Sequence, residues 1–246
     1  MPPAAAVRRS SPWGEFGTAL RRVALPAVAV ALGTVMLGLL LTHVFAHGWL
    51  ARESVVDQDL VRHRTPTGNA VTHVFTYLAE TPTVVALTAV AAVGCRIAFR
   101  RWHESVYVVL AVTGETLIFL LTTLLIDRRR PAVPQLDDAP PTSSFPSGHT
   151  AAALCLYGSV AAVMLWHRRH ALLRALAVTL AILVPLLVGA SRLYRGMHFP
   201  SDVVAGLLLG VTWLSVTTRL VLLREPRHLG RRVPAGSAPR PRETVR

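Results

Sequence analysis

The chain has 246 residues, of which 52% are hydrophobic, and its formal net charge at pH 7 is +13. Its mean hydropathy of +0.46, together with recurrent apolar runs of membrane-crossing length, argues against one or two soluble domains. All 26 basic residues are arginines, and they lie in short loops and tails rather than on one soluble surface, which argues against a nucleic-acid-binding protein.

Six apolar segments are each long enough to cross about 30 Å of hydrocarbon as a helix. In chain order they cover residues 23–46, 76–99, 105–126, 149–166, 171–191 and 202–223. We therefore predict an all-α fold, an integral membrane bundle of six transmembrane helices with short loops. The membrane domain covers 21–224. The polar, Pro/Gly-rich ends at 1–20 and 225–246, the latter strongly basic, are expected to be disordered cytoplasmic tails.

Arginine is distributed unequally between the two predicted faces. Arginine-rich segments precede the first span, join the second to the third and the fourth to the fifth, and follow the sixth. By the positive-inside rule this face is cytoplasmic, so we predict a plasma-membrane protein with both termini inside. Two longer segments, 47–75 and 127–148, then lie outside. The first could hold a short interfacial helix, and the five prolines of the second stiffen it to cover a site.

Three polar clusters lie at the predicted outer ends of the spans. They are Asp-Arg-Arg-Arg-Pro at 127–131, Pro-Ser-Gly-His at 146–149, and a longer cluster that begins Ser-Arg and ends at Asp in 191–202. Because the fourth and fifth spans run across the membrane and back, residues 149 and 192 return to the same face. Folding the bundle should therefore bring the three clusters together.

These clusters contain groups that bind phosphate. Arg130 and Arg192 offer forked, permanently charged donors. Ser147 and Gly148 stand at a predicted helix N-terminus, where free N–H groups and the helix dipole favour an anion. Taken alone, this segment is more typical of an ordinary helix start that carries an interfacial His149.

Two histidines indicate the reaction. His198 lies four residues before Asp202, whose carboxylate can accept the Nδ1 proton and leave Nε2 as a nucleophile. His149, on another helix, can donate a proton to the leaving oxygen and later activate water to hydrolyse a phosphohistidine. Arginines and backbone N–H groups would stabilise the equatorial oxygens.

On these residues the chain resembles the membrane branch of the type 2 phosphatidic acid phosphatase superfamily. The P-S-G-H motif is complete at 146–149, and S-R-x5-H-x3-D is complete from Ser191 to Asp202. The K-x6-R-P motif keeps Arg130 and Pro131 but has Thr123 at the lysine position. The resemblance implies a metal-independent lipid phosphatase without a cofactor. It implies His198 as nucleophile, Asp202 as the partner of His198, and His149 as acid. The phosphate-binding residues that it implies are Arg130, Ser147, Gly148, Arg192 and, as part of the third motif, Ser191.

Other polar residues are weaker candidates. Arg128 could supply a second charge in the first motif, and Arg195 could add a phosphate or headgroup contact. Glu115, near the middle of a span, either pairs inside the bundle or takes part in substrate handling. Asp137 and Asp138 are expected to be solvated.

The favoured function is hydrolysis of a lipid phosphate in the outer leaflet. Candidate substrates are phosphatidic acid, phosphatidylglycerol phosphate, and a polyprenyl phosphate or diphosphate such as undecaprenyl diphosphate. A divalent metal bound by His149, His198 and Asp202 is one alternative, which the neighbouring arginines disfavour. Others are a non-hydrolytic lipid-phosphate binding or transport protein, and vanadate-dependent halide oxidation, which six spans disfavour. The lipid and the oligomeric state stay open.

Overall fold

The structure, a computed structural model, describes residues 11–45, 52–138, 142–167 and 170–224. Within these ranges it is helical, without strands, which confirms the all-α prediction. The α-helices are α1 (Pro12–Leu39), α2 (Glu53–Arg62), α3 (Pro66–Tyr77), α4 (Thr81–Phe99), α5 (His103–Leu125), α6 (Gly148–Trp166), α7 (Ala171–Tyr194) and α8 (Pro200–Leu220). A π-helical turn, Leu40–Val44, extends α1, and a 3-10 turn, Leu222–Arg224, follows α8.

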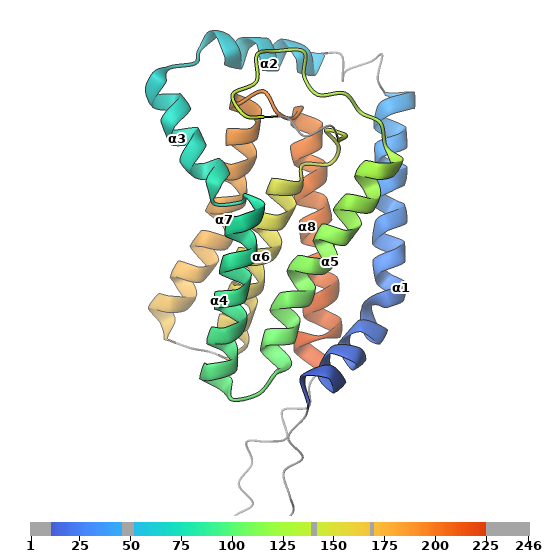
Figure 1. Ribbon diagram of the computed structural model, residues 1–246, viewed down its shortest axis with the longest axis vertical. Helices are drawn as coiled ribbons and strands as arrows, with labels where there is room; N and C mark the ends of the chain where they lie inside the picture. The colour runs from blue at the N-terminus through green and yellow to red at the C-terminus, as the bar shows by residue number, and fades with distance from the viewer. Residues whose placement is uncertain (1–10, 46–51, 139–141, 168–169, 225–246) are drawn as a thin grey trace, which may run out of the picture.

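Six of these helices are long and apolar enough to cross a membrane, namely α1 with its π-turn, α4, α5, α6, α7, and α8 with its 3-10 turn. The six predicted spans are therefore confirmed. Figure 1 shows them running side by side, with α2 lying across one end. Large apolar side chains such as Leu25, Ile97 and Leu124 are exposed on the outer faces, where they would contact lipid tails.

The first helix begins earlier than predicted. We expected disorder to residue 20, but α1 starts at Pro12. The Ser11 hydroxyl accepts a hydrogen bond from the Gly14 N–H, and proline at the first helical position is already fixed in a helical φ. The remainder of the predicted tails, 1–10 and 225–246, lies outside the described residues.

The two outer segments differ from each other in structure. The first contains two helices, α2 and α3, where we predicted that a short interfacial helix could form. The second, as far as it is described, has no helix before Gly148 and is laid over the end of the bundle by backbone hydrogen bonds. The Leu136 N–H donates to the Arg195 carbonyl, and the Ser144 N–H donates to the Arg128 carbonyl.

Close packing of α6 against α8 fixes the start of α6. A Cβ atom at Gly206 of α8 would lie 2.4 Å from the Ser147 carbonyl oxygen, so only glycine permits this approach. On the far side of the bundle core, the Trp213 indole of α8 donates to the Ala111 carbonyl of α5. The motif at 146–149 is thereby held against the last helix.

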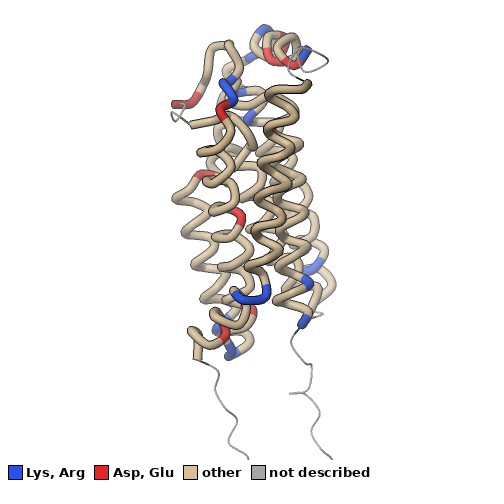
Figure 2. The backbone as a smooth tube through the Cα atoms, turned by 90° about the vertical axis from the view of Figure 1, so that its right-hand side faces the viewer, with Lys and Arg blue, Asp and Glu red and all other residues tan. Residues whose placement is uncertain are grey.

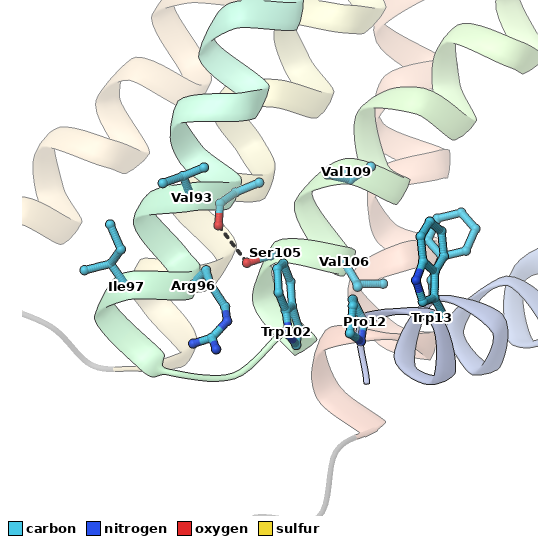
Figure 3. Close-up of a pocket in the computed structure, with 11 residues that line it drawn as sticks. Pro12, Trp13, Val93, Arg96, Ile97, Trp102, Ser105, Val106 and Val109 are labelled. Carbon is cyan, nitrogen blue, oxygen red and sulfur yellow. Dashed lines mark hydrogen bonds between the residues drawn. The ribbon is translucent and has the colours of Figure 1, made fainter. Parts of the chain in front are cut away.

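An apolar cavity of about 280 Å³ lies at the opposite end of the bundle, between the start of α1, the end of α4 and the start of α5 (Figure 3). Trp13, Trp102 and Val106 line it, and the Arg96 guanidinium lies 5.0 Å from the centre of the Trp102 ring. No residue of the three motifs lines this cavity, so it is not the candidate active site.

Candidate active site

A second cavity, of about 920 Å³, lies where α6 begins. Arg130 from the segment after α5, Gly148 and His149 from the first turn of α6, Arg192 from the end of α7, and His198 from the turn before α8 all line it. The structure thus brings together the three polar clusters that the sequence placed at one end of the bundle.

Arg130 and Arg192 both line this cavity, and each has one buried donor without a partner in the described structure. Arg130 donates from Nη1 to the Met197 carbonyl at 2.8 Å, and Arg192 donates from Nη1 to Asp137 Oδ2 at 2.7 Å. Their Nε atoms are buried and have no hydrogen-bond partner within the described part of the chain. Burial lowers the pKa of Arg130, an effect that the charge of Asp202 opposes. An anion with several oxygens would satisfy both N–H groups.

His198 is buried, with its Nδ1 atom 2.7 Å from the Ser144 carbonyl oxygen and 3.8 Å from Asp202 Oδ2. Because both neighbours are acceptors, Nδ1 carries the proton and Nε2 keeps a lone pair. We expected Asp202 to accept this proton, but the loop carbonyl lies closer. Burial lowers the pKa of His198 while the Asp202 carboxylate opposes that shift, so the imidazole is neutral at neutral pH.

Asp202 is fully buried, and its carboxylate accepts hydrogen bonds from groups other than His198. Its Oδ2 accepts the Phe199 N–H at 2.9 Å, and its Oδ1 accepts from Arg128 Nη1 at 2.5 Å. Arg128 also donates to Ser201 Oγ at 2.7 Å and to Glu53 Oε2 at 2.8 Å. Arg128 does not line the cavity. It neutralises two buried carboxylates instead of supplying the second phosphate-binding charge that we had considered.

Glu53, on α2, was missed by the sequence analysis. It accepts the Ser201 N–H at 2.7 Å and the Ser201 hydroxyl at 2.9 Å, and so caps α8 from a position 148 residues away. A helix cap supplied from so far along the chain has no sequence signature. Only the docking of α2 over the bundle brings Glu53 to α8.

The start of α6 differs in detail from the anion-binding helix N-terminus that we predicted. The Ser147 N–H donates to the Asp202 carbonyl at 2.9 Å, and the Ser147 hydroxyl is 2.9 Å from Thr150 Oγ1. Ser147 therefore joins α6 to α8 and does not line the cavity, and its role as a phosphate ligand stays a prediction. Gly148 and His149 do line the cavity, with first-turn N–H groups that have no acceptor inside a helix. A Cβ atom at Gly148 would lie 2.8 Å from the Phe119 ring.

Ser191 and Arg195, two further candidates, are bound by other side chains and do not themselves line the cavity. Ser191 Oγ donates to the Val188 carbonyl and lies 2.9 Å from Thr76 Oγ1, which joins α7 to α3. Arg195 forms a forked pair with Asp137. Neither lines the cavity, so neither has the predicted position for direct phosphate contact.

Asp137 was expected to be solvated, and this was wrong. Its carboxylate binds Arg192 and Arg195 and lines the cavity. Burial would raise its pKa, but the hydrogen bonds from Arg195 and the charges of both arginines outweigh burial and lower it, so Asp137 is ionised. Nothing in the local sequence distinguishes it from Asp138. The pairing results from the loop lying on the end of α7.

Thr123 and Glu115, both on α5, also line the cavity. The Thr123 hydroxyl donates to the Leu120 carbonyl, so the position of the motif lysine carries a satisfied neutral group. Glu115 is 1% exposed, and its Oε1 atom has no partner among the described residues.

Comparison with known proteins gives a consistent result. The model of the PAP2 superfamily matches residues 104–226, half of the chain, and includes the three motif segments. Phosphatidylglycerophosphatase B of Bacillus subtilis (strain 168) is 27% identical over 164 residues, which are 65% of this chain and 78% of that protein. The crystal structure of the first transmembrane PAP2 type phosphatidylglycerolphosphate phosphatase from Bacillus subtilis has a TM-score of 0.67 at 24% identity, and the match covers 78% of this chain and 94% of that one. At this identity it shows a shared fold.

Proposed function

This chain belongs to the PAP2 superfamily and is a membrane phosphatase, and we propose that it hydrolyses a lipid phosphomonoester or diphosphate through a phosphohistidine, without a metal ion. One observation carries the proposal. A single cavity holds two histidines, His149 and His198, and two arginines, Arg130 and Arg192, whose Nε atoms are buried and unpaired in the described structure. The name of the curated relative supports a phospholipid phosphate as substrate.

In the proposed first step, His198 Nε2 attacks the phosphorus, and the bond to the lipid oxygen breaks. The Nδ1 proton stays on the ring, hydrogen-bonded to the Ser144 carbonyl, and the nearby Asp202 carboxylate stabilises the positive imidazole. His149 gives its proton to the departing lipid oxygen. In the second step His149 takes a proton from water, the water oxygen bonds to phosphorus, and the phosphorus–nitrogen bond breaks to release phosphate.

Arg130, Arg192 and the N–H groups at the start of α6 would bind the equatorial oxygens, where charge is greatest in the transition state. These cations also disfavour the metal alternative, since they would repel a divalent ion. Both Asp202 carboxylate oxygens already accept hydrogen bonds from Arg128 and Phe199. The residues present therefore suit an anion better than a cation.

The cavity shape supports a lipid substrate that enters from the side. Val85 of α4 and Leu120 of α5 line the cavity, yet they are 62% and 47% exposed at the bundle surface. The cavity therefore reaches the lipid-facing surface beside these helices. With the arginine-rich loops placed in the cytoplasm, this entrance would face the outer leaflet of the plasma membrane.

The nucleophile can be identified by trapping. We expect His198→Ala to lower phosphate release from phosphatidylglycerol phosphate or phosphatidic acid by roughly a thousand-fold, because no covalent intermediate can form. His149→Ala should lose lipid hydrolysis but still react with p-nitrophenyl phosphate, whose leaving group needs no acid. Without the base that activates water, the phosphohistidine should then accumulate and be visible by intact-protein mass spectrometry.

All assays would contain EDTA, and His73→Ala is the matched control, since His73 is an exposed histidine of α3 outside the cavity. Full activity in His198→Ala would exclude it as nucleophile. Activity that disappears in EDTA and returns with one added metal would support the metal alternative. Binding of lipid phosphate without turnover by folded wild-type protein would support the non-hydrolytic one.

A further inference from the structure

The active-site cavity continues along α5, well beyond the phosphate-binding residues. Thr113, Thr116, Leu120 and Thr123 line it at spacings of three and four residues, so they lie along one face of the helix. At 1.5 Å per residue, Thr113 lies about 15 Å from Thr123 along the axis. The cavity therefore extends from the end of the bundle into the part of α5 that crosses hydrocarbon.

Glu115 lies in this deep part and differs from the neighbouring polar residues. The Thr113 hydroxyl donates to the Val109 carbonyl at 2.7 Å, and the Thr116 hydroxyl donates to the Val112 carbonyl at 3.0 Å, so both are satisfied within α5. Glu115 is 1% exposed and belongs to the cavity lining, and its buried Oε1 atom has no partner in the described part of the chain. A buried carboxyl oxygen left unpaired is unfavourable, so the cavity contains a polar group that a ligand can satisfy.

We propose that Glu115 is a specificity-determining residue that hydrogen-bonds to the polar backbone of a glycerophospholipid phosphate; this rests on the proposed function. When the phosphate lies against Arg130 and Arg192, the rest of the lipid follows the cavity along α5. A glycerolipid carries hydroxyl groups or ester carbonyls beyond its phosphate. The Glu115 carboxyl group can donate to a carbonyl or accept from a hydroxyl.

A polyprenyl phosphate cannot make this contact. Beyond its phosphate or diphosphate it is hydrocarbon, so binding would bury Glu115 against carbons and leave its Oε1 atom without a hydrogen bond. A site built to hydrogen-bond a polar group discriminates against an analogue that lacks it. The cavity should therefore favour glycerolipids over polyprenyl substrates.

The test compares Glu115→Gln, which keeps hydrogen-bonding groups, with Glu115→Leu, which removes them. Thr122→Val is the matched control, because Thr122 lies on the same helix, its hydroxyl is already bonded to the Ile118 carbonyl, and it does not line the cavity. Phosphate release is measured from phosphatidylglycerol phosphate, phosphatidic acid and undecaprenyl diphosphate in the same mixed micelles. Glu115→Leu should raise the KM for the glycerolipids roughly ten-fold, leave their kcat within about two-fold, and not raise the KM for undecaprenyl diphosphate. Glu115→Gln should stay close to the wild-type selectivity, and Thr122→Val should not change it.

Equal losses on both substrate classes in Glu115→Leu would mean that Glu115 supports the bundle, and would overturn the proposal. Unchanged selectivity in Glu115→Leu would overturn it as well. Failure of the proposed function looks different, because the wild-type protein would then hydrolyse none of the three lipids. Thermal unfolding of each variant in detergent shows whether a loss of activity is caused by misfolding. If Glu115→Leu is misfolded, the selectivity of Glu115→Gln decides the test: wild-type selectivity supports the proposal, and equal losses on both substrate classes overturn it.

Discussion

Single side chains in this site are held by partners that lie far away in sequence. Asp137 is bound in a forked pair by Arg195, and its remaining contact, at 2.7 Å, is to Nη1 of Arg192. This leaves the Arg192 Nε atom buried and without a partner among the described residues, in a side chain that lines the cavity. Asp137 therefore fixes the orientation of Arg192, the arginine that we propose binds phosphate, and it would also place a negative charge near the bound anion.

These two effects of Asp137 can be separated. We expect Asp137→Asn to lower kcat/KM roughly ten-fold, because a charge-assisted hydrogen bond that positions Arg192 is lost. Asp138→Asn removes the same charge one residue away, from an exposed side chain that also lines the cavity. It should leave kcat/KM within about two-fold. Steady-state kinetics on one lipid substrate measure both, and an increase in both variants would show that charge matters more than position.

At the scale of one element, α2 acts as a cover for the N-terminus of α8. Glu53 connects it to Arg128 and Ser201. One helical turn later, Asp57 is 1% exposed, and both of its carboxylate oxygens have no partner within the described ranges. Burial, followed by the charges of Glu53 and Asp202, raises the pKa of Asp57 to about 7, although Arg128 opposes the shift.

The raised pKa of Asp57 predicts how stability depends on pH. In the unfolded chain its pKa is 3.8, so the folded state disfavours the ionised form. The resulting loss of stability is absent below about pH 4, grows as pH rises to about 7, and is constant above that. We therefore expect Asp57→Asn to unfold at a higher temperature than wild type at pH 8, with a difference that disappears towards pH 4.

Thermal unfolding followed by tryptophan fluorescence across this pH range measures the difference. Asp59→Asn is the control, since Asp59 is on the same helix but its side chain is 63% exposed. A difference that does not change with pH would mean that Asp57 is already ionised, or neutral, throughout the range.

The whole molecule is a bundle in which charged positions lie mainly towards the two ends (Figure 2). The candidate active-site cavity lies at the α2 end, and the arginine-rich connection from α4 to α5 lies at the other, where α6 ends and α7 begins. Membrane insertion tends to keep the arginine-rich end in the cytoplasm. The site would then open to the outside.

This orientation can be tested with single cysteines in a Cys95→Ala, Cys155→Ala background. Gln58→Cys probes exposed α2, and His170→Cys probes the exposed residue before α7 at the other end. A membrane-impermeant maleimide applied to intact cells should label Gln58→Cys at once and His170→Cys only after permeabilisation. The reverse pattern would place the active site in the cytoplasm.

The sequence by itself determined the spans and the groups that converge. Apolar runs of membrane length must form helices, because no water is present to bind free backbone groups, and the return of the chain after two spans fixes which ends meet. The spans beginning near residues 105, 149, 171 and 202 could therefore be located to within a few residues, and the cavity holds His149, His198, Arg130 and Arg192 as the motifs suggested.

Only the tertiary structure decided which polar group pairs with which. Arg128 binds Glu53 and Asp202 rather than phosphate, and the Ser144 carbonyl is the nearest acceptor of the His198 proton. Such choices depend on differences of about one ångström between competing partners from distant segments. Local patterns carry no information at that precision, because the loop and α2 reach their positions only when the complete bundle has formed.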